Sequence, residues 1–266
     1  GLFRSLRDTG IVSEVFPPEQ LKSLGKGTIA VGHVRYGTTG SDNKRNVQPI
    51  LVNHFKGRMA LAHNGNLTNS RELRQELESR GSIFQTTTDS EVIAYIIVQE
   101  RLNRGSIEEA VSAAMDRIEG AYSLVLSSPT KLIAARDPHG FRPLCIGLLD
   151  GDCYVFASET CALDALGAKF VRDVEPGEVC VVENGKLRSM HCDIKCKTSA
   201  CVFEYIYFAR PDSIIDGASV ELARQEAGKY LSIEHPVGAD VVIGVPDSGI
   251  PAAIGYANTS KRPVSY

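Results

Sequence analysis

The sequence predicts an α+β protein in which helices cover β-sheets. Strand patterns fill the early part of the chain, three helix patterns follow one another between residues 69 and 118, and strand patterns return after Gly120. Strands, then consecutive helices, then strands again are typical of sheets covered by helices rather than of a repeated strand–helix–strand unit. The 266 residues fit one large domain or two ordinary ones.

Composition excludes several classes of function. Hydrophobic residues make up 43% and charged residues 23%, as in globular proteins. The net charge of -3 gives no electrostatic footprint for nucleic acid, and no apolar run approaches the length of a membrane-spanning helix, so we expect neither nucleic acid nor a membrane as a partner. The seven cysteines are odd in number and scattered through apolar runs, which predicts reduced thiols and a cytoplasmic protein.

The elements are expected in the following order. Hydrophobic alternation predicts strands at 10–16, 29–36, 49–52 and 58–62, with a polar loop over 37–46. A helix at 71–80 is followed by two helices that begin with the capping boxes Thr88–Glu91 and Ser106–Glu109. Further strands, separated by turn residues, are expected at 122–126, 132–135, 144–148, 154–157, 170–174 and 179–183.

A second domain is expected to begin near residues 195–202, which divides the chain into 1–199 and 200–266. An aromatic strand at 201–208 and a helix at 219–231 precede a strand at 240–245 of the fully buried kind found in parallel sheets. The turn at 246–251 and a helix at 252–257 follow, and the second domain has only begun when the sequence stops.

The apolar run 59–62 stops at His63-Asn64-Gly65-Asn66. Asn and Gly tolerate positive φ, so a sharp turn here leaves backbone N–H groups and a carboxamide pointing at one spot, which is how an oxyanion hole is built. A plain hairpin turn explains the same residues and, for this motif alone, is the simpler interpretation. His63 beside it is an acid–base candidate or a hydrogen-bonded structural histidine.

Two charged residues could serve a substrate. Arg35 ends a predicted strand, where a guanidinium suits a carboxylate, although a surface arginine is the simpler interpretation. The capping box leaves the Asp89 carboxylate spare at the positive end of a helix, where it could hold an ammonium group. Ordinary helix-start chemistry explains Asp89 equally well.

Two further patterns lie near the second domain. Cys192, Cys196 and Cys201 lack the Cys-x-x-Cys spacing of structural zinc sites, although Cys201 could bind a metal group completed by distant residues. The turn 245–249 follows a predicted parallel strand and leads into a helix, which is where open α/β sheets bind phosphate-bearing ligands. It lacks the spacing of a Walker or dinucleotide motif.

Taken together, the motifs resemble a known family. Gly-His-Val-Arg-Tyr at 32–36, His-Asn-Gly-Asn-Leu at 63–67 and Thr-Thr-Asp-Ser-Glu at 87–91 resemble the glutamine amidotransferases with an N-terminal nucleophile. The stretches that narrow the resemblance to the glutamine phosphoribosylpyrophosphate amidotransferase family are 136–144, 157–160, 203–213 and 245–249.

The resemblance implies a four-layer αββα sandwich over 1–199, followed by the beginning of an α/β phosphoribosyltransferase domain. It implies a cytoplasmic homotetramer that transfers glutamine-derived ammonia to phosphoribosylpyrophosphate, giving 5-phosphoribosylamine in the first step of purine biosynthesis. Glucosamine-phosphate synthase and asparagine synthetase share the glutaminase domain and are the nearest alternatives. A non-catalytic relative is a further one.

The resemblance also implies roles for individual residues in the glutamine site. Arg35 would bind the α-carboxylate of glutamine, with Thr38 in the loop that closes over it. Asn64 and Gly65 would form the oxyanion hole, and Asp89 would hold the α-ammonium group. A scaffold would have no use for such a set of groups, which argues against a non-catalytic relative.

Further roles fall in the second domain. Cys201 resembles a ligand of the [4Fe-4S] cluster of one subgroup. Ser248 resembles a residue near Mg²⁺ and the diphosphate, with Asp247 and Gly249 in the same loop. The family's nucleophile is an N-terminal cysteine, but this chain begins at Gly1 and none of its cysteines is followed by glycine. We therefore expect an incomplete polypeptide that lacks glutaminase activity as it stands.

Overall fold

The protein was analysed as a computed structural model, which describes residues 3–35 and 44–265. The chain forms two compact units, Gly1–Arg142 with Val174–Ser199, and Pro143–Asp173 with Ala200–Tyr266. The division at 199/200 lies at the expected place, whereas 143–173 groups with the C-terminal residues. The assignment of 1–199 and 200–266 to separate domains stays a prediction.

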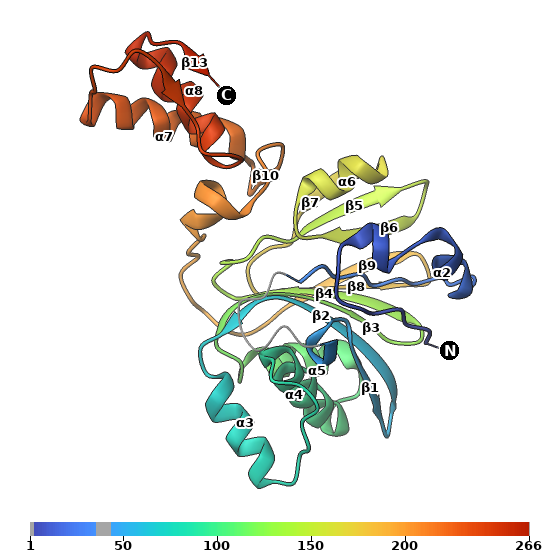
Figure 1. Cartoon of the computed structure of the whole chain (residues 1–266). Coiled ribbons are helices and arrows are strands. Elements are labelled where there is room, and N and C mark those ends of the chain that lie inside the picture. Colours follow the sequence, from blue (N-terminus) through green and yellow to red (C-terminus); the bar gives the residue numbers. More distant parts are fainter. Residues whose placement is uncertain (1–2, 36–43, 266) are drawn as a thin grey trace. The chain divides into compact units, whose positions relative to one another are not determined.

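A six-stranded antiparallel sheet forms the centre of the first unit (Figure 1). Its spatial order is β1-β2-β3-β4-β8-β9, and its strands are β1 (Ile50–His54), β2 (Gly57–Leu67), β3 (Gly120–Ser127), β4 (Lys131–Arg136), β8 (Glu178–Glu183) and β9 (Lys186–His191). The strands expected in these regions are confirmed. Strand β9 was not predicted, because its sequence is largely polar and most of its residues are exposed at the sheet edge.

Three helices accompany this sheet, as expected from their apolar spacing: α3 (Ser70–Ser79), α4 (Asp89–Asn103) and α5 (Ile107–Met115). Helices α4 and α5 pack on each other and on the strands, and Figure 1 shows them on one face of the sheet. Leu61, Ile93 and Leu124 are among the fully buried core residues. Removing each such side chain from water contributes about 2 kcal/mol before packing effects.

Only one of the two expected capping boxes forms. Ser106 Oγ accepts a hydrogen bond from the backbone N–H of Glu109, whose carboxylate reaches back to the N-cap, as predicted. The box Thr88–Glu91 is wrong, because the Glu91 carboxylate instead accepts hydrogen bonds from the backbone N–H groups of Gln85 and Thr86. Glu91 thus secures the segment that leads into α4 rather than the helix end itself.

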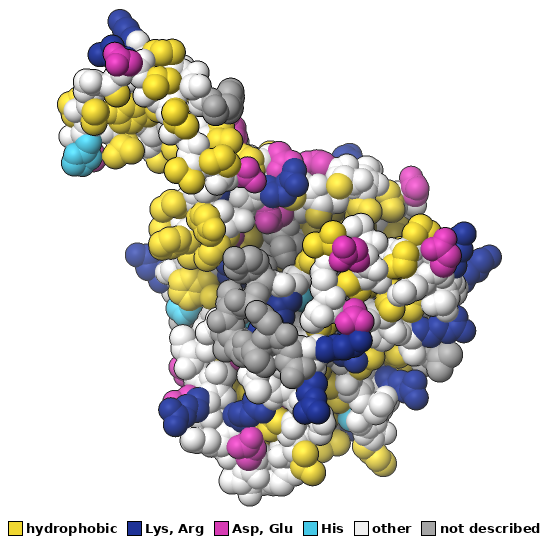
Figure 2. All heavy atoms as spheres, viewed as in Figure 1, with side chains coloured by type: hydrophobic (Ala, Val, Ile, Leu, Met, Phe, Trp, Pro, Cys, Tyr) yellow, Lys and Arg dark blue, Asp and Glu magenta, His cyan; other side chains and the backbone are white. Residues whose placement is uncertain are grey.

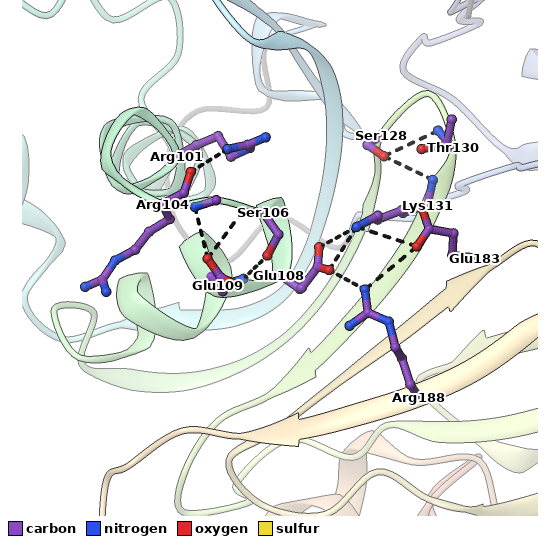
Figure 3. A network of polar contacts seen from close by, with 11 residues as sticks. Arg101, Arg104, Ser106, Glu108, Glu109, Ser128, Thr130, Lys131, Glu183 and Arg188 are labelled. Carbon is purple, nitrogen blue, oxygen red and sulfur yellow. Dashed lines mark hydrogen bonds and ion pairs between the residues drawn. The ribbon is translucent and has the colours of Figure 1, made fainter.

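A buried carboxylate ties α5 to the sheet (Figure 3). Glu108 accepts a hydrogen bond from Lys131 Nζ on β4 at 2.8 Å and another from Arg188 on β9. Burial by itself raises the pKa of Glu108, but the hydrogen bonds from Lys131 and Arg188 outweigh it and lower the pKa to about 2. The carboxylate therefore stays ionised across the physiological range.

Two N-terminal predictions are wrong. The expected strand at 10–16 contains the short helix α1 (Val12–Val15), which is followed by α2 (Pro18–Ser23). Residues 29–35 form no strand, and the end of that expected range lies outside the described residues. Alternation yields a strand only where a neighbouring edge pairs with it, and within the described residues β1 pairs with β2 alone. Segment η1 (Lys44–Asn46) precedes β1.

The second unit begins with a three-stranded antiparallel sheet of order β6-β5-β7. Its elements are β5 (Cys145–Leu149), β6 (Cys153–Ala157), α6 (Thr160–Leu166) and β7 (Lys169–Asp173), and its three strands match the expected ones. Leu163 of α6 is fully buried with Cys145 and Ala168. Together with the first unit, this confirms the α+β class of the chain.

The expected aromatic strand at 201–208 is wrong. Residues 204–208 form a wide helical turn, η2 (Glu204–Phe208), with a hydrogen bond from the Ala209 N–H to the Glu204 carbonyl. The buried guanidinium of Arg224 donates hydrogen bonds to the carbonyls of Tyr205 and Ala209. The carbonyls of Tyr205 and Ala209 therefore bond to the Arg224 side chain, whereas in a strand they would bond to a neighbouring strand.

The remaining elements are β10 (Ile214–Ile215), β11 (Ala218–Ser219), α7 (Val220–Glu234), β12 (Val242–Ile243), α8 (Gly249–Ser260) and β13 (Val264–Ser265). Helices α7 and α8 pack closely because Gly228 and Gly255 lie at their contact, where a Cβ on either would overlap the other helix's backbone. Both helices were expected, as was the parallel pairing, which β12 makes with β13.

The expected burial of the strand at 240–245 is wrong. Ile243 is 63% and Val245 79% exposed, and Figure 2 shows many hydrophobic side chains on the surface of this C-terminal part. Among the described residues β12 pairs only with β13, so most of the strand lacks neighbours that would cover it. None of the described helices has the length and hydropathy needed to cross a membrane.

Candidate functional site

The motif 63–66 lies inside a strand, so the predicted turn is wrong. β2 continues to Leu67 and pairs with β3, with Asn64 opposite Ser123 and Gly65 opposite Tyr122. Gly65 has φ +147°, and a Cβ there would overlap the carbonyl oxygen of Ala121. The glycine therefore permits a close approach of β3 rather than a turn.

The carboxamide of Asn64 is held by an arginine from a distant part of the chain. Arg142 Nη2 donates a hydrogen bond to Asn64 Oδ1 at 2.7 Å. Arg142 ends the loop that follows β4, and its own backbone N–H donates to Asp137 Oδ2 at 3.1 Å. The asparagine, which is only partly buried, thus has a fixed neighbour on one edge of its carboxamide.

The side chains of Asp137 and Arg136 hold the backbone of the loop 137–142 through hydrogen bonds. Asp137 also accepts hydrogen bonds from the backbone N–H groups of His139 and Phe141. Burial raises the pKa of the Asp137 carboxyl, although these hydrogen bonds and Arg136 oppose the change. The buried guanidinium of Arg136 donates to the carbonyls of Arg142, Gly140 and Val174. The sequence therefore builds a rigid loop from an Arg-Asp pair.

Asp89 meets the same strand. Its Oδ2 accepts a hydrogen bond from the backbone N–H of Leu67 at 2.9 Å, and the residue is 7% exposed. The carboxylate is therefore not spare, as the sequence suggested, because one oxygen joins the start of α4 to the end of β2. The structure thus places Asn64, Gly65 and Asp89 on or against one strand of the first unit.

His63 is the buried neighbour of Asn64. Its Nδ1 lies 3.1 Å from Ser90 Oγ and 3.7 Å from Asp89 Oδ1. Burial lowers the pKa of His63 and Asp89 opposes this, with a net lowering, so the imidazole is neutral at pH 7. The side chain of Gln48 bonds to both the N–H and the carbonyl of His63, which fixes the strand here.

Arg35 lies two residues after His33, in a segment that forms neither a helix nor a strand. Burial, with help from the charges of His63 and Arg35, lowers the pKa of His33 to about 4. Arg35 itself is half-buried, and Thr38 lies outside the described residues.

The remaining predicted residues, Cys201, Asp247, Ser248 and Gly249, belong to the second unit. Asp247, Ser248 and Gly249 lie where β12 leads into α8, with Asp247 exposed and no hydrogen bond from the Ser248 side chain to the helix start. Cys201 immediately precedes the helical residues 202–208. In the part of the chain that the structure describes, no three His, Cys, Asp or Glu side chains gather into a metal site.

Comparison with known proteins places this geometry in a family. Residues 33–165, half of the chain, match the family described as "Glutamine amidotransferase domain". The chain belongs to this glutamine amidotransferase domain family. The matched range includes Asn64 and Gly65 of β2, the residues Asp89 and Arg142 that bond to this strand, and Arg35.

Longer relatives match nearly the whole chain, including the residues beyond the glutamine amidotransferase domain. Amidophosphoribosyltransferase of Archaeoglobus fulgidus is 47% identical over 98% of this chain and 56% of its own length, and that of Bacillus subtilis is 47% identical over 96% and 53%. The chain thus spans about half the length of the curated relatives it matches.

Two solved structures also match nearly the whole of this chain. One, described as the allosteric regulatory enzyme of purine biosynthesis, has a TM-score of 0.90 and 47% identity over 96% of this chain and 54% of its own. The other, glutamine phosphoribosylpyrophosphate amidotransferase from B. subtilis complexed with ADP and GMP, has a TM-score of 0.88 and 46% identity over 96% and 55%.

Sequence reasoning missed several residues that contact the candidate site. Arg142 bonds to Asn64, and Ser90 and Gln48 bond to His63, yet none of the three stood out as a candidate. Arg142 belongs to a motif that carried the family resemblance, and that was its only signal. Its partner Asn64 lies 78 residues away in sequence, beyond the reach of any local pattern.

Proposed function

We propose that this chain is part of an amidophosphoribosyltransferase, which uses ammonia from glutamine to convert phosphoribosylpyrophosphate into 5-phosphoribosylamine, the first step of purine biosynthesis. The observation that carries the proposal is the group of Asn64, Gly65 and Asp89 on or against β2, in a chain 47% identical along nearly all its length to the A. fulgidus enzyme.

In the proposed glutamine site, Arg35 binds the α-carboxylate of the substrate through two parallel hydrogen bonds. Thr38 belongs to the loop that closes over it. Asp89 keeps one carboxylate oxygen on the Leu67 N–H, and the second oxygen faces the α-ammonium group. The neighbouring His63 is neutral, so it does not repel that ammonium group.

Asn64 and Gly65 stabilise the negative oxygen that forms during glutamine cleavage. When the thiolate of the family's N-terminal cysteine attacks the glutamine carboxamide, the carbonyl oxygen becomes negative. The Asn64 side-chain amide and the Gly65 backbone N–H then donate hydrogen bonds to it. Losing one such donor typically raises the barrier by about 3 kcal/mol. Because both groups are fixed on a paired strand, little reorganisation is needed when charge develops.

The released ammonia reacts in the second domain, where it displaces diphosphate from the anomeric carbon. Residues 1–199 supply the four-layer αββα glutaminase domain and 200–266 the beginning of the phosphoribosyltransferase domain. Asp247, Ser248 and Gly249 form the loop that faces the diphosphate, at the positive end of α8. The whole protein is proposed to be a cytoplasmic homotetramer.

Two inorganic groups are implied by the resemblance. Ser248 carries an oxygen donor of the kind that Mg²⁺ prefers, so it would help to hold the ion that neutralises the diphosphate. A [4Fe-4S] cluster needs four thiolates, and among the described residues no three His, Cys, Asp or Glu side chains gather around Cys201. In the whole protein Cys201 would supply one of these thiolates, and no step of the reaction is assigned to the cluster.

The test uses the whole protein. We expect it to form phosphoribosylamine and diphosphate from phosphoribosylpyrophosphate with either glutamine or ammonium, and Asn64→Ala to lose only the glutamine-dependent rate, by about 100-fold or more. Glutamate release with no phosphoribosylpyrophosphate consumption would instead support glucosamine-phosphate synthase or asparagine synthetase. Absence of glutamate release under all conditions would support a non-catalytic relative.

A further inference from the structure

The contact between Arg142 and Asn64 determines how the asparagine is oriented. A guanidinium carries only hydrogen-bond donors, so the edge of the carboxamide that faces Arg142 Nη2 at 2.7 Å must be its oxygen. The carboxamide is planar, and its Nδ2 is therefore directed away from Arg142. An oxyanion hole requires a donor at that position, and the reversed amide would present an acceptor that repels the oxyanion.

Arg142 is held firmly enough to impose this orientation. Its backbone N–H donates to Asp137 Oδ2, and its carbonyl accepts from Arg136 Nε at 2.8 Å and from Ser123 Oγ at 3.2 Å. Ser123 lies directly opposite Asn64 in the β2–β3 pairing. The backbone of the arginine is thus anchored to the strand next to the one that carries the asparagine.

The charge of Arg142 acts in the same direction. A cation on the oxygen of an amide draws electron density from its N–H groups and strengthens them as donors. The guanidinium is partly buried, so this effect is screened less than at an exposed site. Orientation and polarisation both favour the negative oxygen of the tetrahedral intermediate over the neutral carbonyl of bound glutamine.

We propose that Arg142 is a positioning residue of the oxyanion hole, which locks the Asn64 carboxamide with Nδ2 toward the reacting carbonyl. This inference depends on the proposed glutaminase function. It assigns Arg142 a role in the rate of glutamine cleavage, exerted through Asn64 and without contact to the substrate.

Kinetics of the whole protein test the role. We expect Arg142→Met to lower kcat for glutamine hydrolysis about 10-fold to 100-fold, less than the 100-fold to 1,000-fold expected for Asn64→Ala. KM for glutamine and the ammonia-dependent rate should change less than about 3-fold. Arg142→Lys keeps a charge and a donor but not the planar fork, so it should recover part of the lost rate.

The decisive measurement is a double-variant cycle. If Arg142 acts only through Asn64, Arg142→Met should cost nothing further in the Asn64→Ala background, so the double variant should match Asn64→Ala within about 2-fold. Arg58→Met, an exposed arginine on the same strand, is the matched control and should leave every rate unchanged. If the two losses multiply instead, the proposal is overturned, as it is by a raised KM with unchanged kcat.

Two further outcomes are separated by controls. If Arg142→Met does not fold, as judged by thermal unfolding, the cycle is run with Arg142→Lys, and multiplicative losses there overturn the proposal in the same way. If the unaltered protein releases no glutamate from glutamine, the proposed function itself fails and this inference falls with it. If the unaltered protein is active but the two losses multiply in the double variant, only the proposed role of Arg142 is overturned, and the proposed function stands.

Discussion

The carboxylate of Asp89 accepts a hydrogen bond from the backbone N–H of Leu67 at 2.9 Å, which joins the first residue of α4 to the last residue of β2. This contact brings a charged group from a helix start to the strand that carries Asn64 and Gly65. The second carboxylate oxygen, Oδ1, lies 3.7 Å from Nδ1 of the neutral His63. Changes to Asp89 and to the residues near it therefore have separable effects on substrate binding and on stability.

The charge of Asp89 can be removed without removing its structural hydrogen bond. In Asp89→Asn the amide oxygen still accepts from the Leu67 N–H, so the fold should persist with an unchanged unfolding midpoint. The lost attraction for an α-ammonium group should raise KM for glutamine about 10-fold to 100-fold. Steady-state kinetics measure this, with exposed Asp116→Asn as control. An unchanged KM would remove Asp89 from the proposed pocket.

Arg35 should matter for glutamine alone. Loss of the paired hydrogen bonds to the α-carboxylate in Arg35→Ala should lower glutamine-dependent synthesis about 100-fold and leave ammonia-dependent synthesis intact. Comparing the two rates in the whole protein measures this, with exposed Arg58→Ala as the matched control. Equal loss of both rates would contradict the assigned role, because it would indicate damage to the fold.

Two glycines of β2 allow backbone strain to be separated from steric overlap. Gly65 has φ +147° and Gly57 φ +133°, yet an added Cβ overlaps the Ala121 carbonyl at Gly65 and meets no atom within 4 Å at Gly57. We expect Gly65→Ala to lower the free energy of unfolding by about 3 kcal/mol more than Gly57→Ala does. Denaturant titration measures both. Equal losses would show that φ alone, and not the approach of β3, requires glycine.

The Glu108 network predicts a dependence of stability on pH. The pKa of Glu108 is lowered from 4.5 to about 2, so its contribution is complete above pH 4.5 and disappears as the pH falls toward 2. Glu108→Gln should lose about 2 kcal/mol of unfolding free energy at pH 7 and flatten this part of the profile. Denaturant titrations at several pH values test it, with exposed Glu78→Gln as control. If the stability–pH profiles of the unaltered protein and of Glu108→Gln run parallel, the pH dependence does not come from Glu108.

Local chemistry determined much of this protein from sequence alone. The helices α3, α4 and α5, most strands of the large sheet and the Ser106–Glu109 capping box were all predictable, because apolar spacing and cap residues act within a few positions of each other. The motif 63–67 could also be recognised from the sequence as a candidate functional motif, because the apolar run 59–62 stops abruptly at polar residues.

Tertiary structure decided what these residues do. Asn64 and Gly65 lie in a strand and not a turn because β3 pairs with them. Residues 204–208 are helical, and Arg224 binds the carbonyls of Tyr205 and Ala209 there. The partners of Asp89 and Asn64 are 22 and 78 residues away. Such contacts depend on which elements pack together, and their geometry follows from the sum of many weak interactions that no local pattern encodes.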